Sequence, residues 1–140
     1  MFRIQIDEQF ACQVGSGSTA GSKVTRFLSI VVPVYNGGAT FEHCLRAILT
    51  SAASDTEVLV VDAGSTDDSA TRAERLGVRV IRLQGRRGPA EARNIGAQEA
   101  RGEYLCFIDA DCEVHAKTLA LLKARLRKNP EITAAFGSYD

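Results

Sequence analysis

The sequence predicts an α/β protein with a mostly parallel sheet and helices on both faces, and three observations support this prediction. Short apolar, β-branched segments recur from residue 27 onward. Segments in which apolar residues have helical spacing alternate with them, and Gly, Pro and Asn mark the connections. Such an alternation is typical of βαβ units, which place parallel strands side by side in one sheet.

Five segments have the composition of buried strands. Residues 27–34 form a continuous apolar run, as expected for a strand that is covered on both faces. Pro33, near the end of this run, predicts that strand pairing stops there. The remaining expected strands are residues 57–62, 78–83, 103–109 and 132–136.

Four helices are expected between and after these strands. Thr40 is expected to cap the first helix, which runs to about residue 51. The apolar residues of this helix share one face: Phe41, Cys44, Leu45 and Ile48.

The other three helices also have recognisable ends. Ser65 or Thr66 is expected to cap the second helix, which ends at Gly77. Pro89 opens the third helix at its first position. Residues 117–128 form the fourth, which Pro130 stops.

Composition excludes several classes of protein. The 17 acidic and 17 basic side chains cancel, so there is no long-range attraction to nucleic acid or anionic membrane. The four cysteines form no C-x-x-C pair, and we expect reduced thiols in a cytoplasmic protein. No apolar run approaches the roughly 20 residues of a membrane span.

The N-terminal region differs from the rest of the chain. Residues 15–22 are all Gly, Ser, Thr or Ala, which is typical of a flexible linker. We therefore expect residues 1–26 to be an extension and linker, and residues 27–140 to form one domain. Residues 1–14 are compatible with either a strand or loose chain.

Polar residues cluster where the expected strands end. In open α/β sheets ligands bind outside the carboxyl ends of the strands, so these positions are informative. Tyr35 follows the first strand, Asp62 ends the second, and Asp109 and Asp111 come at the end of the fourth. All of these loops are expected at one edge of the sheet.

The Asp109-Ala110-Asp111 segment is the most distinctive of these features. Two carboxylates two residues apart at a strand end can reach one small site, and a cation between them would relieve their repulsion. Mg²⁺ or Mn²⁺ suits such a site, since these hard ions take a few protein carboxylates and complete their shell with phosphate oxygens. The alternative is a polar turn or a helix cap, which the position at a strand end disfavours.

The loop after the third strand is basic. Arg86 and Arg87 lie between Gly85 and Gly88, and Pro89 begins a helix that points its N-terminus at the same edge. A helix N-terminus with arginines nearby can bind an anion. For each of these two arginines a solvated surface position is an equally good interpretation.

Four segments together resemble a family 2 glycosyltransferase with the GT-A fold. They read LSIVVPVYN from residue 28, VVDAGSTD from residue 60, GPAEARNIG from residue 88 and ARGEYLCFIDAD from residue 100. The order and spacing of the four make the resemblance specific, and it covers residue 27 to the end.

The resemblance implies an activity and a set of roles. Family members transfer a sugar from a nucleotide diphosphate donor, usually with inversion, to a glycan, lipid or small-molecule acceptor. It implies that Pro33, Tyr35 and Asp62 line the nucleoside pocket and that Arg93 lies near the phosphates. It also implies that Asp109 approaches the ribose or the metal, and that Asp111 holds the metal against the diphosphate.

The chain departs from the family pattern in two places. Many members carry two adjacent acids where this chain has Asp62-Ala63, which leaves the donor base open. Members also continue beyond the fifth strand, and the later part supplies the acceptor site and the general base. We therefore expect a donor-binding portion without its catalytic base, in which any membrane association would come from the missing part.

A donor-binding fragment without turnover shares every motif and remains open. Two other functions fit the motifs less well. A receiver-like signalling domain needs an acidic cluster after the first strand, where this chain has Tyr35-Asn36. A dinucleotide-binding oxidoreductase needs G-x-G-x-x-G in the first turn, which is lacking here.

Overall fold

The structure, a computed structural model, describes residues 4–5 and 26–137. These residues fall into two compact units. The larger unit lies within Val24–Ala116, and the smaller contains Ile4–Gln5 and the described residues from Lys117 onward. The predicted linker over residues 15–22 lies outside the described residues.

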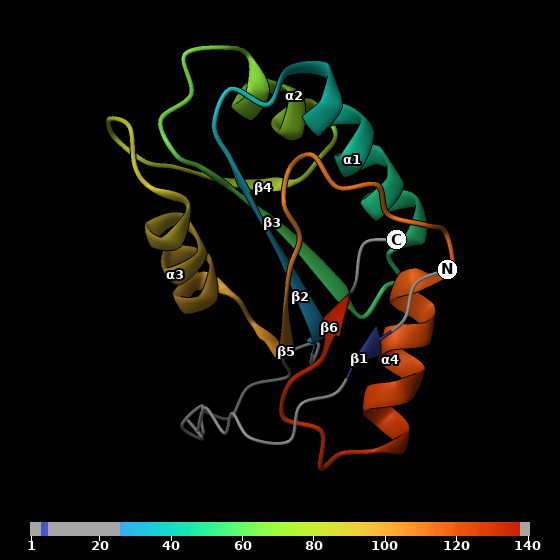
Figure 1. Ribbon diagram of the computed structural model, residues 1–140. Helices are drawn as coiled ribbons and strands as arrows, with labels where there is room; N and C mark the ends of the chain where they lie inside the picture. The colour runs from blue at the N-terminus through green and yellow to red at the C-terminus, as the bar shows by residue number, and fades with distance from the viewer. Residues whose placement is uncertain (1–3, 6–25, 138–140) are drawn as a thin grey trace. The chain divides into compact units, whose positions relative to one another are not determined.

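The larger unit is built on a four-stranded parallel sheet with three helices (Figure 1). The strands lie in the order β4-β3-β2-β5. Their bounds are Arg26–Val34 for β2, Thr56–Asp62 for β3, Arg79–Arg82 for β4 and Gly102–Phe107 for β5. The helices are α1 (Gly38–Ser51), α2 (Ser69–Arg75) and α3 (Pro89–Glu99).

The chain winds in two directions from the central strand. It passes from β2 through α1 to β3 and through α2 to β4, and then returns through α3 to β5 on the other side of β2. Because such crossovers are right-handed, α1 and α2 cover one face of the sheet and α3 covers the other, as Figure 1 shows. The predicted α/β class, with a parallel sheet and helices on both faces, is confirmed.

The core has a layer on each face of the sheet. On the α3 side, Val31 and Val61 pack with Ala92 of α3. A Cβ at Gly96 would lie 2.3 Å from Val31 Cγ1, so α3 sits directly on the strand. Toward the other helices, α1 buries the four residues predicted for its inner face: Phe41, Cys44, Leu45 and Ile48.

Pro33 ends one strand pairing but not the other. The pairing of β2 with β3 continues to Val34, whereas its pairing with β5 ends at Val31. Ile108 N donates to Val31 O, so Val31 and, two residues on, Pro33 direct their backbone groups toward β5. Since Pro33 has no N–H to donate, β5 separates from β2 beyond this point. The prediction that all pairing stops at Pro33 was therefore wrong on the β3 side.

The expected fifth strand over residues 132–136 is also wrong. In the smaller unit, β6 (Phe136–Gly137) is two residues long and pairs antiparallel with β1 (Ile4–Gln5), apart from the parallel sheet. The segment has the composition and length of a strand, but composition does not specify a pairing partner.

The fourth helix agrees with its prediction. It is α4 (Thr118–Lys128), in which Leu119 and Leu126 are buried. Within the described residues, every helix is too short or too polar to cross a bilayer.

Two predicted helix caps are wrong. The first helix begins at Gly38, so Thr40 lies inside it. The second begins only at Ser69, and neither Ser65 nor Thr66 caps it. Both side chains instead bind Asn36 in the loop after β2, which competes with capping. Pro89 occupies the first turn of α3 as predicted.

Candidate donor-binding site

A cavity of about 590 Å³ lies at the carboxyl ends of the strands. It opens where the strand order reverses, between the ends of β2 and β5. The separation of β5 from β2 beyond Pro33 widens the same place. Its volume falls within the roughly 300–1,000 Å³ of small-molecule sites. The cavity is lined by Pro33, Val34, Tyr35, Ala63, Arg86, Arg87, Gly88, Pro89, Arg93, Asp109, Ala110 and Asp111.

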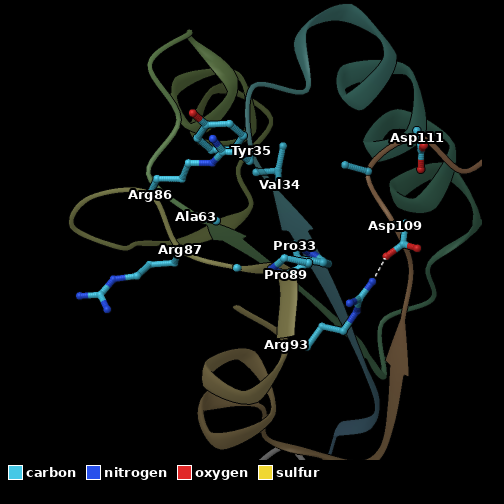
Figure 2. Close-up of a pocket in the computed structure, with 12 residues that line it drawn as sticks. Pro33, Val34, Tyr35, Ala63, Arg86, Arg87, Pro89, Arg93, Asp109 and Asp111 are labelled. Carbon is cyan, nitrogen blue, oxygen red and sulfur yellow. Dashed lines mark hydrogen bonds and ion pairs between the residues drawn. The ribbon is translucent and has the colours of Figure 1, made fainter. Parts of the chain in front are cut away.

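Five of the six residues predicted for the site line this cavity. Pro33 and Tyr35 come from the end of β2, Arg93 from α3, and Asp109 and Asp111 from the loop after β5 (Figure 2). The loops that carry them are far apart in sequence and meet because parallel strands end at the same edge.

Asp62 is placed differently from the other predicted residues. It ends β3, is 4% exposed, and is not among the lining residues. Val61 packs on the α3 side, so by alternation Asp62 points to the opposite face of the sheet. Its Oδ1 accepts a hydrogen bond from Ser65 N at 3.1 Å. Asp62 thus shapes the turn that follows β3, directly behind Ala63 of the cavity wall.

The acidic side of the cavity contains an ion pair. Arg93 Nη2 donates to Asp109 Oδ1, which links α3 to the loop after β5, as the dashed line in Figure 2 marks. The two side chains are 34% and 48% exposed, so both remain accessible to a ligand. Arg93 reaches this position because it lies one turn into a helix that Pro89 begins at the cavity rim.

Two hydrogen bonds fix the backbone of the acidic loop, residues 109–111, on the side that faces the core. The carbonyl oxygen of Asp109 accepts hydrogen bonds from Cys112 N at 3.0 Å and from Cys44 Sγ at 3.6 Å. Burial raises the pKa of the Cys44 thiol to about 11. The Cys44 thiol therefore stays protonated near neutral pH and can act as the donor.

The acidic pair offers hard oxygen ligands without forming a complete metal cage. Over the residues that the structure describes, no three His, Cys, Asp or Glu side chains are grouped to hold a metal ion. Asp109 and Asp111 supply carboxylate oxygens at the cavity wall. This donor set fits Mg²⁺ or Mn²⁺, which bind through one or two carboxylates and take further oxygens from water and phosphate.

A hydrogen-bond network joins the loop after β2, which carries Tyr35, to the loop after β3. Asn36 has a left-handed backbone with φ of 49°, and its Oδ1 accepts hydrogen bonds from Thr66 N at 2.8 Å and Asp67 N at 3.2 Å. Asn36 N donates to Ser65 Oγ at 2.9 Å. The network fixes the residue that follows Tyr35, and so it limits where that ring can lie.

A carboxylate strengthens this network. Asp67 Oδ2 accepts from Gly38 N at 3.2 Å, and its Oδ1 accepts from Ser69 N at 3.0 Å. Burial alone would raise the pKa of Asp67, but hydrogen bonds from Ser69 and Gly38 outweigh it and lower the pKa. The carboxylate therefore stays charged at neutral pH and holds the start of α1 against the loop after β3.

Two features of the site were missed from the sequence. One is the Asn36 network; the Asn36-Gly37-Gly38 turn was the signal, because asparagine tolerates a positive φ and its side chain bonds nearby backbone. The other is a contact between Arg86 and Tyr35, in which Arg86 Cζ lies 4.9 Å from the ring centroid. No pattern in the sequence indicates that contact.

Fold and site together define an α/β protein with a cavity and an acidic loop at the switch point of its parallel sheet. The profile of Glycosyl transferase family 2 matches residues 29–140. The chain belongs to this family, as the sequence resemblance predicts.

Known relatives agree with this assignment. Glycosyltransferase GlyG of Streptococcus pneumoniae is 30% identical over 121 residues, a match that covers 83% of this chain and 40% of GlyG. The uncharacterized glycosyltransferase YibD of Escherichia coli is 35% identical over 96 residues, covering 65% of this chain and 28% of YibD. The chain thus spans well under half the length of these relatives.

Solved structures share the fold. S. aureus TarS in complex with UDP-GlcNAc has a TM-score of 0.71 and 27% identity, covering 74% of this chain and 32% of TarS. Glucosyl-3-phosphoglycerate synthase from Mycobacterium tuberculosis, in complex with Mn²⁺ and UDP-glucose, has a TM-score of 0.60 and 29% identity. That match covers 78% of this chain and 45% of the synthase. The fold is that of the GT-A glycosyltransferases.

Proposed function

We propose that this chain is the donor-binding part of a glycosyltransferase that transfers a sugar from a nucleoside diphosphate with the help of a divalent metal. The observation that supports this most is the meeting of Tyr35, Arg93, Asp109 and Asp111 around one cavity at the switch point. An aromatic ring, a guanidinium and two carboxylates match the base, the phosphates and the metal of such a donor.

The base end of the cavity is formed by the end of β2. Tyr35 lines the cavity and is 39% exposed, so its ring is an aromatic surface on which a nucleobase could stack. Pro33 forms apolar wall next to it. Asp62 contributes from behind this wall by holding the turn at Ser65. Structural neighbours bound to UDP and UDP-GlcNAc support uridine as the base.

The diphosphate end is formed by Arg93, Asp109 and Asp111. Asp111 and Asp109 would hold Mg²⁺ or Mn²⁺, and the ion would stabilise the charge that develops on the leaving diphosphate. Arg93 can turn from Asp109 to a phosphate oxygen, since charged oxygens of either kind suit its guanidinium. The Arg93–Asp109 ion pair keeps a guanidinium and a carboxylate side by side at the cavity wall, which supports this assignment.

The acceptor site and the general base belong, in this proposal, to parts of the relatives that this chain does not span. An inverting transfer needs a base within hydrogen-bond reach of the acceptor hydroxyl. Donor binding without turnover is therefore the second candidate for this chain alone. A transfer assay with sugar nucleotides and extracted acceptors separates the two candidates.

Calorimetry with UDP tests donor binding directly. We expect UDP to bind with Mn²⁺ and to lose about tenfold or more in affinity without it, because Asp109 and Asp111 would hold a cation whose charge offsets that of the diphosphate. Asp111→Asn should remove most of this metal dependence. Glu113→Gln is the matched control, because it removes an exposed carboxylate two residues away that does not line the cavity. Equal metal dependence in the wild type and Asp111→Asn would refute the assignment.

A further inference from the structure

Arg86 lies over the one aromatic side chain among the residues that line the cavity. Its Cζ is 4.9 Å from the centroid of the Tyr35 ring, and both residues line the cavity. The two come from different loops, Tyr35 after β2 and Arg86 after β4. Figure 2 shows the Arg86 side chain extending toward the ring.

The loop that carries Arg86 is anchored at its base. Arg87 N donates to Ala63 O at 3.0 Å, and Leu83 N donates to Asp62 O at 2.9 Å. The loops after β3 and β4 also touch through backbone, because a Cβ at Gly64 would lie 2.2 Å from Gly85 O. This anchored backbone fixes the origin of the Arg86 side chain, so its guanidinium can move while its Cα stays at the cavity rim.

Arg87 provides a contrast within the same loop. Its guanidinium donates to Glu91 Oε1 at 3.2 Å and to Gln84 O at 3.2 Å. In Figure 2 its side chain points away from Tyr35 and from the acidic loop. The two adjacent arginines carry the same charge but differ in direction. Arg86 extends over the Tyr35 ring, whereas Arg87 extends away from it toward Glu91.

We propose that Arg86 is a binding residue of the nucleobase subsite, whose planar guanidinium moves off Tyr35 to cover the bound base. This inference rests on the proposed donor binding. A ring between two flat groups needs two contact layers of about 3.5–4.0 Å each. The 4.9 Å separation is too small for this, so a base that stacks on this face of Tyr35 must displace the guanidinium.

The displaced guanidinium can form a favourable contact with the bound base. Arginine stacks on aromatic planes as well as forming hydrogen bonds, and a nucleobase offers both a π-face and polar edges. Arg86 thus exchanges a contact with Tyr35 for one with the base. Tyr35 and Arg86 then cover the two faces of the base, and the fit of the base between them determines how close these contacts are.

Binding of UDP and UMP to the full chain tests this role. With Mn²⁺ present, Arg86→Ala should weaken both nucleotides about tenfold, because a stacking contact to the base is lost in each. Arg86→Lys should lose nearly as much, since an ammonium keeps the charge but lacks the plane. Arg75→Ala, at an exposed position of α2 that does not line the cavity, is the matched control and should stay within twofold of the wild type.

The outcomes separate this inference from the proposed function. If the wild type bound neither UDP, GDP nor ADP, the proposed donor binding itself would be wrong. If the wild type bound UDP but Arg86→Ala stayed within twofold, or Arg86→Lys bound as tightly as wild type, the role of Arg86 would be wrong. A loss with UDP but not with UMP would place Arg86 on the diphosphate and would also overturn it. Circular dichroism checks that each variant is folded.

Discussion

Asp109 combines two functions at the scale of a single residue. Its side chain pairs with Arg93, and its backbone carbonyl accepts hydrogen bonds from Cys44 and Cys112. The first contact faces the cavity and can exchange for metal and phosphate. The second faces the core and keeps the loop in place while that exchange occurs. Cys44 is thus a buried support for the acidic loop.

The state of Cys44 gives a prediction with a pH dependence. Burial raises its pKa to about 11, and a raised pKa means that the protonated thiol stabilises the fold below its ordinary pKa. This contribution is lost as pH rises from the ordinary pKa near 9 through 11. At pH 8 its thiolate fraction is about a hundredfold below that of an ordinary thiol, so iodoacetamide should alkylate Cys44 at least that much more slowly.

Mass spectrometry of alkylated peptides measures this rate at several pH values. Glutathione in the same solution is the reference thiol, and unfolding in guanidinium should bring Cys44 to a comparable rate. Alkylation of folded Cys44 at the rate of glutathione at pH 8 would show that the thiol is neither buried nor protonated as described.

Residue positions could be predicted from the sequence where the backbone alone decides them. Tyr35, Asp109 and Asp111 were predicted for one site because strand ends share an edge, and Arg93 because it lies one turn into a helix that starts there. The structure brings these four to one cavity, whereas Asp62, predicted on the same grounds, does not line it. The Arg86 contact could not be predicted, because a long side chain on a glycine-flanked loop has many rotamers that no sequence pattern selects.

At the scale of elements, the contact of α3 with β2 determines where Arg93 lies. Gly96 lets the helix approach, since a Cβ there would be 2.3 Å from Val31 Cγ1 and 3.1 Å from Val61 Cγ2. Both valines are fully buried and cannot move aside. Arg93 lies about one helical turn before Gly96 and is carried by the same contact.

Gly96→Ala should therefore lower the free energy of unfolding by about 1–2 kcal/mol. With a contact of 2.3 Å the cost should lie in the upper part of the roughly 1–3 kcal/mol that is typical of overpacking, and the better helix propensity of alanine offsets about 1 kcal/mol of it. UDP affinity should fall as well, because α3 and Arg93 move away from Asp109. Urea denaturation and calorimetry measure the two effects. Gln98→Ala, at an exposed position of the same helix, should change neither, and an unchanged Gly96→Ala would contradict the close contact.

The Asn36 network between the loops after β2 and β3 gives a second prediction at the scale of elements. Asn36→Ala removes the acceptor for Thr66 N and Asp67 N, and it places alanine at a positive φ. The free energy of unfolding should fall by about 1–3 kcal/mol. Asn36→Asp, which keeps the acceptor, should lose least, and Asn36→Gly, which keeps only the backbone freedom, should lie between. An Asn36→Ala variant as stable as Asn36→Asp would show that the network contributes nothing.

The same network explains why the start of the second helix was predicted wrongly. A serine or threonine before an apolar helical pattern is a reasonable cap, but its hydroxyl can bind any nearby partner. Ser65 and Thr66 bind Asn36, which lies about 30 residues earlier and comes close only in the folded chain. Pro89 and Gly77 were predicted correctly because their backbone restrictions act locally, whatever the tertiary context.

At the scale of the whole molecule, the return of the chain through α3 creates the site. Strands added to one side of β2 by α1 and α2, and to the other by α3, leave a crevice between the loops after β2 and β5. The alternation of strands and helices predicted the parallel sheet, but not which strand would be central. The segment 132–136 resembled a strand in composition, and composition does not specify a pairing partner.

The account depends on one central claim, that a nucleoside diphosphate and a divalent metal bind together in this crevice. A crystal structure with UDP and Mn²⁺, with the metal located by its anomalous scattering, tests it most directly. We predict Mn²⁺ bound to a carboxylate oxygen of Asp111 and to the diphosphate, with the uracil ring stacked on Tyr35. A metal peak away from the acidic loop, or UDP bound outside the cavity between β2 and β5, would contradict the account.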